Sequence, residues 1–174
     1  MKAIDIVRPA LLAALTAALA YIIIPLPFSP VPVTLQTLGV MLAGVVLTPH
    51  QAALAMGVYV LLGAIGAPIF SGGTAGLGTL LGPAGGYLVG FVPGAALIAI
   101  IRGNDGRITR LTTAVITGGL LAIYLPGTLW LSYVTGMGFT AALTVGTLPY
   151  IPGDLLKALA AIALGNRLKH TRFR

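Results

Sequence analysis

Asp154 and Lys157 are the residues of this chain whose types and spacing best suit chemistry. They stand three positions apart, so their side chains share one face of a helix. No other charged residue lies between Arg110 and Arg167. A charge inside a bilayer costs about 2.5–3.5 kcal/mol on insertion scales and is typical of a functional site. We therefore predict a ligand site in which Lys157 meets a carboxylate and Asp154 accepts N–H groups.

Two structural alternatives remain open for this pair. Asp154 follows Pro152 and Gly153, so its carboxylate could cap the start of a helix. The pair could also be a structural ion bridge at the outer end of that helix. The usual role of charges within a membrane favours the ligand site over both.

A glycine-rich segment, residues 67–85, is a second candidate. It contains Gly72, Gly73 and Thr74, and glycine lets backbone approach a small molecule closely. The alternative is a flexible connector. The segment has no lysine and therefore does not match a phosphate-binding P-loop. Gln36 and Tyr87, near the outer ends of predicted helices, either hydrogen-bond a ligand or satisfy neighbouring backbone.

Catalytic and metal-binding patterns are absent from the sequence. There is no cysteine, no HExxH motif, no pair of carboxylates and no Ser-His-Asp set. His50 and His170 have no second metal ligand at a usable spacing. We expect no enzyme, no metal site and no cofactor.

The composition places the chain in lipid. Only 7% of the 174 residues are charged and 57% are hydrophobic, whereas a soluble domain carries about a quarter charged residues. The net charge of +7 is not the footprint of a nucleic-acid site, because the basic residues flank apolar runs and form no face interleaved with aromatics. The bilayer is the expected partner of this surface.

The apolar runs predict an all-α integral membrane protein, one domain of residues 1–174 with six transmembrane helices. The expected spans are about 9–24, 33–47, 49–66, 83–101, 111–134 and 149–166. A proline-rich break separates the first two, and residues 135–148 are expected to be a loop with a short surface helix. Thr48, Pro49 and Gln51 predict a helix start with a capping box.

The basic residues set the expected orientation, because they favour the cytoplasmic side. With six spans, the two termini and the loop near residue 105 share one face. That face then holds nine of the ten basic residues, which are Lys2, Arg8, Arg102, Arg107, Arg110, Arg167, Lys169, Arg172 and Arg174. We expect both termini in the cytoplasm and an uncleaved first span, with the proline-rich and glycine-rich segments outside.

Two stripes of small residues predict close helix packing. Gly82, Gly86, Gly90 and Gly94 recur every four residues in the fourth span, and packing inside the bundle is favoured there. A second stripe in the first span consists of Ala10, Ala14 and Ala18. Its spacing alone leaves open whether it packs internally or docks a partner subunit.

Four ordered motifs resemble one known family, the BioY family, over essentially the whole chain. They are Pro27-Phe28-Ser29-Pro30-Val31-Pro32-Val33-Thr34-Leu35-Gln36-Thr37-Leu38, Gly66-Ala67-Pro68-Ile69-Phe70-Ser71-Gly72-Gly73, Gly82-Pro83-Ala84-Gly85-Gly86-Tyr87-Leu88 and Pro152-Gly153-Asp154-Leu155-Leu156-Lys157. One departure is Ala84, where the family commonly has threonine, so a hydroxyl contact there is in doubt.

The resemblance implies a substrate-binding S component of an energy-coupling factor (ECF) transporter in a prokaryotic cell membrane. It implies capture of biotin from outside, and a coupling transmembrane subunit and two ATPase subunits as partners. Its helix 1 stripe, Ala10, Ala14 and Ala18, is then the docking face. The expected ligand contacts are Asp154, Lys157, Tyr87, Gly72, Gly73, Thr74, Gln36 and Phe28. The alternatives are an S component for another small vitamin and a stand-alone secondary transporter.

Overall fold

The computed structural model describes residues 3–172, with the side chains of residues 3–167. The helices are α1 (Ala3–Leu19), α2 (Gln36–Val46), α3 (Pro49–Ala64), α4 (Leu77–Leu81), α5 (Gly85–Arg102), α6 (Ile108–Ile116), α7 (Ala122–Thr135), α8 (Phe139–Gly146) and α9 (Ile151–Arg172). Two single 3-10 turns, η1 (Ser71–Gly73) and η3 (Leu148–Tyr150), and a π turn, η2 (Thr117–Leu121), join them. The strands β1 (Ile23–Ile24) and β2 (Val33–Thr34) form an antiparallel hairpin.

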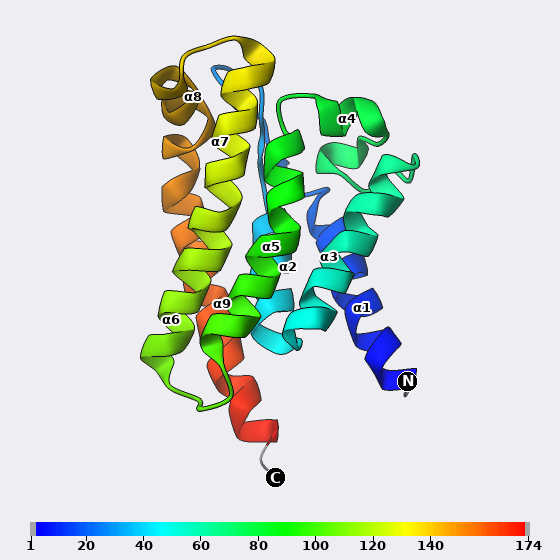
Figure 1. The fold of residues 1–174 in the computed structure, drawn as a ribbon, viewed down its shortest axis with the longest axis vertical. Coiled ribbons are helices and arrows are strands. Elements are labelled where there is room, and N and C mark those ends of the chain that lie inside the picture. The colour runs from blue at the N-terminus through cyan, green and yellow to red at the C-terminus, as the bar shows by residue number, and fades with distance from the viewer. Residues whose placement is uncertain (1–2, 173–174) are drawn as a thin grey trace.

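The long helices run between two ends of the molecule (Figure 1). The N- and C-terminal ends and the α5–α6 turn lie at one end, drawn at the bottom. The α4 helix and the α7–α8 connection lie at the other. Within the described residues, three helical stretches are long and apolar enough to cross a membrane, Gly85–Arg102, Ile108–Thr135 and Phe139–Arg167. The chain is thus a mostly helical membrane protein with several apolar spans.

The first predicted span has different ends in the structure. The helix α1 starts before residue 9, at Ala3, and Asp5 in its first turn complements the helix dipole. It ends at Leu19, whereas the prediction continued to residue 24. The β-branched residues Ile23 and Ile24 instead pair with Thr34 and Val33, because the prolines that follow favour extended backbone.

The other helices differ from prediction mainly at their ends. The second begins at Gln36, after β2, and the last begins at Ile151. The glycine-rich segment contains η1 and α4, which the sequence analysis did not expect. The predicted capping box is confirmed: Thr48 Oγ1 accepts from Gln51 N, and Gln51 Oε1 accepts from Thr48 N. The short helix expected between residues 135 and 148 is α8.

The glycine stripe of α5 packs inside the bundle, as favoured. A Cβ atom on Gly86 would lie 2.3 Å from Trp130 Cβ, and one on Gly94 would lie 2.7 Å from the Gly118 carbonyl oxygen. These neighbours belong to α7 and η2, so the absence of side chains lets α5 contact them closely. Gly82 lies outside the helix, after α4, and is not part of this contact.

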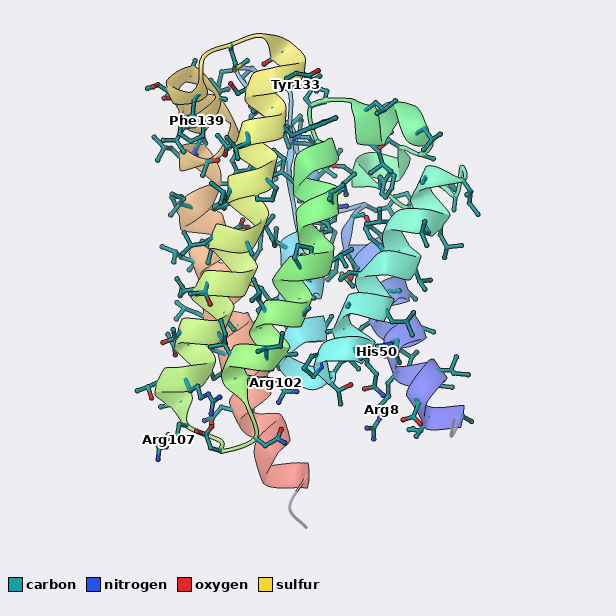
Figure 2. The ribbon with its side chains drawn as sticks, viewed as in Figure 1. Arg8, His50, Arg102, Arg107, Tyr133 and Phe139 are labelled. Atoms are coloured by element: carbon teal, nitrogen blue, oxygen red, sulfur yellow. The ribbon has the colours of Figure 1, made fainter. Side chains whose placement is uncertain are left out.

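Basic side chains gather at the end of the molecule that holds the termini. Figure 2 shows Arg8, Arg102 and Arg107 there, with Tyr133 and Phe139 at the opposite end. Arg102 donates to the carbonyl oxygens of Gly44 and Leu47, at 2.9 and 2.6 Å, and so caps the carboxyl end of α2. Lys2 and Arg174 lie outside the described residues, as do the side chains of Lys169 and Arg172.

Candidate functional site

A cavity lies among α2, α5, α7 and α9 and the segments that follow β1 and α3. Apolar groups dominate its wall, which includes Val31, Pro32, Phe70, Leu88, Phe91 and Ile123. Its polar groups are Thr34, Gln36, Thr37, Ser71, Thr79, Tyr87, Tyr124, Tyr150, Asp154 and Lys157. An apolar wall with a few convergent polar groups is what a small organic solute needs.

Asp154 and Lys157 form a buried ion pair in this wall. Their side chains are 3% and 9% exposed, and Lys157 Nζ lies 2.5 Å from Asp154 Oδ1. The ammonium also donates to the Thr34 carbonyl oxygen at 2.6 Å and to Thr37 Oγ1 at 3.1 Å. All three N–H groups of Lys157 are therefore used.

Asp154 accepts hydrogen bonds from three different elements. Besides Lys157, its Oδ1 accepts from Thr37 Oγ1 at 2.9 Å, and its Oδ2 accepts from Tyr124 Oη at 2.5 Å. These donors come from α9, α2 and α7. The helix-cap alternative is wrong, because α9 begins at Ile151 and Asp154 lies inside its first turn. Since a carboxylate has about four acceptor sites, Oδ2 retains capacity for one further donor.

A second chain of hydrogen bonds starts at Thr34, whose carbonyl oxygen accepts from Lys157. Thr34 Oγ1 donates to Gln36 Oε1 at 2.8 Å, and Gln36 Nε2 donates to Tyr59 Oη at 2.5 Å. Tyr59 in turn donates to the Ile69 carbonyl oxygen at 2.8 Å. Gln36, predicted as a ligand contact, therefore lines the cavity and is held by α3 and the loop that follows it.

Tyr87, also predicted as a contact, lines the cavity from α5. Its ring covers Gly127, where a Cβ atom would lie 2.2 Å from the ring. Its hydroxyl donates to the Gly146 carbonyl oxygen at 2.6 Å. Tyr87 thus offers mainly its ring face to the cavity, because its hydroxyl hydrogen is already used.

Gly72, Gly73, Thr74 and Phe28 are not part of the cavity wall. Gly72 and Gly73 have positive φ values of 64° and 82°, which glycine adopts without strain, and Gly72 N donates to the Ala20 carbonyl oxygen. Thr74 Oγ1 donates to the Ser71 carbonyl oxygen, and Phe28 is 58% exposed. These glycines set a turn, and the turn places Ser71 in the wall instead.

Sequence reasoning missed Thr37, Tyr124, Tyr150 and Ser71 as cavity residues. Tyr150 Oη donates to the Val31 carbonyl oxygen and lies 2.7 Å from Ser29 Oγ. It thereby fixes the proline-rich segment to the start of α9. Thr37 and Ser71 stood within the quoted motifs. Tyr124 and Tyr150 had no distinguishing signal, because single tyrosines are common at membrane interfaces.

The helix 1 stripe points away from the bundle. Ala10, Ala14 and Ala18 are exposed, whereas Ala13 and Thr16 are buried against α2 and α3. The stripe is therefore not used for packing within the described chain, and one face of α1 is open to lipid or to another subunit.

Fold and cavity together define a mostly helical membrane protein with a mostly apolar cavity whose wall contains a buried ion pair. Comparison with known families narrows this class. The BioY family matches residues 1–174, and the chain belongs to that family.

Related sequences align with nearly the whole chain. The biotin transporter BioY of Rhizobium etli is 41% identical over 174 residues, covering 95% of this chain and 92% of its own. The probable biotin transporter BioY of Pyrococcus horikoshii is 41% identical, covering 97% and 98%. A crystal structure of the S-component for biotin from an ECF-type ABC transporter matches with a TM-score of 0.87 at 29% identity, covering 95% of this chain and 90% of that one. These relatives are transporters, in agreement with the expectation that the chain is not an enzyme.

Proposed function

We propose that this chain is a biotin-specific S component that captures biotin from outside the cell. It delivers the vitamin inward when coupled to a transmembrane coupling subunit and two ATPase subunits. The observation that carries the proposal is the buried Asp154–Lys157 pair in the wall of a mostly apolar cavity in a chain of the BioY family. A mostly apolar wall with a buried polar pair suits a small organic ligand.

Charge balance favours a particular orientation of biotin. The cavity wall carries one positive and one negative side chain, and these already form a pair. A neutral pair suits the ureido group, whose N–H groups can donate to Asp154 Oδ2. Its carbonyl oxygen can accept from Lys157 when the ammonium exchanges its hydrogen bond to Thr37 Oγ1 for one to the ligand. A carboxylate beside the pair would lie next to Asp154, and two like charges at close range repel each other. The charged pair alone predicted the opposite orientation, with the carboxylate at Lys157, so the test must distinguish the two.

The test is equilibrium binding of labelled biotin to the purified chain in detergent, without partner subunits. We expect saturable nanomolar binding, about −12 kcal/mol. Lys157→Ala removes a donor from the site and should weaken binding strongly. The matched control is Leu156→Ala, because Leu156 is 69% exposed. Absence of binding to folded wild-type chain would refute the proposal and call for a screen of other vitamins.

An analogue separates the two orientations. The analogue has a methyl group in place of the carboxylate of biotin. If Lys157 contacts the ureido group, Lys157→Ala should lower the affinities for biotin and for this analogue by the same factor. If Lys157 contacts the carboxylate, Lys157→Ala should lower the affinity for biotin and leave the affinity for the analogue unchanged.

Six spans with cytoplasmic termini remain our proposal for the topology. The clustering of Arg8, Arg102 and Arg107 at the end that holds both termini supports it (Figure 2), because basic residues favour the cytoplasmic face. The cavity then opens outward, where biotin is captured.

The exposed helix 1 stripe is the proposed docking face for the coupling subunit, since small residues let helices approach closely. Ala14→Leu should abolish co-purification with the coupling subunit and ATPases and leave biotin binding unchanged. Ala160→Leu, at an exposed alanine of α9, is the matched control and should assemble normally. Equal assembly of both variants would rule out this face.

A further inference from the structure

Ser71 has a buried hydroxyl that forms no hydrogen bond with the part of the chain that the structure describes. Among the described side chains, those of residues 3–167, its Oγ is the one buried polar atom without a hydrogen-bond partner. Buried polar atoms are normally paired, and Ser71 lies in the wall of the cavity. The hydroxyl is therefore placed where a bound molecule can meet it.

The backbone around Ser71 is fixed, so the hydroxyl is presented in a defined position. Its carbonyl oxygen accepts from Thr74 N and Thr74 Oγ1, and the next residue, Gly72, donates its N–H to the Ala20 carbonyl oxygen. Phe70, on the other side, is fully buried against Gly63 and Tyr59. These contacts hold the chain on both sides of Ser71 and leave its side chain free.

Ser71 is separated from the ion pair by a chain of hydrogen bonds. This chain leads from Lys157 through Thr34, Gln36 and Tyr59 to the Ile69 carbonyl oxygen. It ends two residues before Ser71, on the connection between α3 and α4. That connection lies on the other side of α5 from α8 and the start of α9 in Figure 1. Because Ser71 and the ion pair line the same cavity from different elements, a solute held at the ion pair by one end can extend its other end toward Ser71.

We propose that Ser71 donates its hydroxyl hydrogen to the carboxylate of the bound solute and makes the site specific for a free acid. This inference rests on the proposed function and on placement of the ureido group at the Asp154–Lys157 pair. Thr79, also in this part of the wall, donates its own hydroxyl to the Ala75 carbonyl oxygen. Ser71 is thus the hydroxyl donor available on that side.

The experiment compares wild type, Ser71→Ala and Ser132→Ala by equilibrium binding of two probes. The probes are biotin and the analogue with a methyl group in place of the carboxyl group. Ser132→Ala is the matched control, because Ser132 Oγ donates to the Met137 carbonyl oxygen and is not part of the cavity wall. Thermal unfolding of the ligand-free variants is measured in parallel.

We expect Ser71→Ala to weaken biotin binding about 10- to 100-fold, the effect of losing a hydrogen bond to a charged group. Affinity for the methyl analogue should change less than about twofold. Ligand-free Ser71→Ala should unfold at the wild-type temperature or above it, because removal of an unpaired hydroxyl does not destabilise the fold. Ser132→Ala should bind both probes as wild type does.

Three results would overturn the inference. Unchanged biotin affinity in Ser71→Ala, with wild type binding normally, would mean that the hydroxyl meets only water. An equal loss for both probes would place Ser71 at another part of the solute. Failure of wild type itself to bind biotin would refute the proposed function, and this inference with it.

Discussion

Asp154 and Lys157 depend on each other for solvation, because both are buried in a mostly apolar wall. Their attraction offsets the cost of removing two charges from water only while both are present. Thr37 and Tyr124 contribute further hydrogen bonds to the carboxylate. Removal of either partner alone should therefore destabilise the fold, because it leaves the other charge buried and unpaired.

Asp154→Asn should destabilise the chain by about 3–5 kcal/mol, because it leaves the Lys157 ammonium buried beside a neutral amide. The double variant Asp154→Leu/Lys157→Met, which removes both charges, should recover most of that stability and still bind no biotin. Thermal unfolding in detergent, with biotin binding on the same samples, measures both effects. A double variant no more stable than Asp154→Asn would contradict this account.

The charged pair could be predicted from the sequence, but the residues that hydrogen-bond to it could not. Two charges in an apolar stretch are readable without a structure. The roles of Tyr124 and Ser71 depend on how α7 and the α3–α4 connection are placed around the cavity, and no local pattern encodes that placement. Gly72 and Gly73 were predicted as ligand contacts; in the structure their positive φ values form the turn that precedes Thr74.

Among the elements, α5 has the densest surroundings, since it packs against α2, α3, α6, η2 and α7. Its contact with α7 depends on the glycine stripe. A Cβ atom on Gly86 would lie 2.3 Å from Trp130 Cβ and 2.5 Å from the Pro126 carbonyl oxygen. Because the second neighbour is backbone, the clash cannot be relieved by a side-chain rotation alone.

Gly86→Ala should therefore destabilise the chain by about 1–3 kcal/mol, the usual cost of overpacking. The matched control is Gly57→Ala in α3, where a Cβ atom would meet nothing within 4 Å. That control should be neutral or stabilising by up to about 1 kcal/mol, because alanine favours helix more than glycine does. Thermal unfolding of both variants measures the difference, and equal stability would refute the close contact.

Helices were easier to predict than the connections between them. Long apolar runs and the Thr48 capping box follow from local rules. The β1–β2 hairpin did not, because Ile23 and Ile24 continue an apolar run and become a strand only through pairing with Val33 and Thr34. The α4 helix was hidden by the glycines of its segment, since glycine disfavours helix.

Across the whole molecule, the two ends differ in charge. The end with both termini carries Arg8, Arg102 and Arg107, and the opposite end carries Tyr133 and Phe139 (Figure 2). This asymmetry follows from the sequence alone, because every described basic residue except Lys157 flanks an apolar run. The distribution of basic residues also determines the orientation of a membrane protein in the bilayer.

The absence of cysteine makes this orientation directly testable, since each introduced thiol is unique. Gly138, in the α7–α8 connection, and Asn104, in the α5–α6 turn, are exposed. These two connections lie at opposite ends of the molecule (Figure 1). In intact cells, Gly138→Cys should react with a membrane-impermeant thiol reagent, and Asn104→Cys should react only after permeabilisation. The reverse pattern would invert the proposed topology. Reaction of both in intact cells would refute the single span proposed between these two positions.

The pairing of Asp154 with Lys157 also determines how the cavity responds to membrane voltage. Together the two side chains contribute no net charge, so moving the empty cavity through the electric field does no electrical work. A bound biotin adds its carboxylate, and one elementary charge moved across 100 mV corresponds to about 2.3 kcal/mol. With a negative cell interior, the inward step of the loaded subunit is opposed by the field, while the return of the empty cavity is independent of it. ATP hydrolysis by the proposed partners would then have to supply electrical work only for the inward movement of the biotin-loaded subunit.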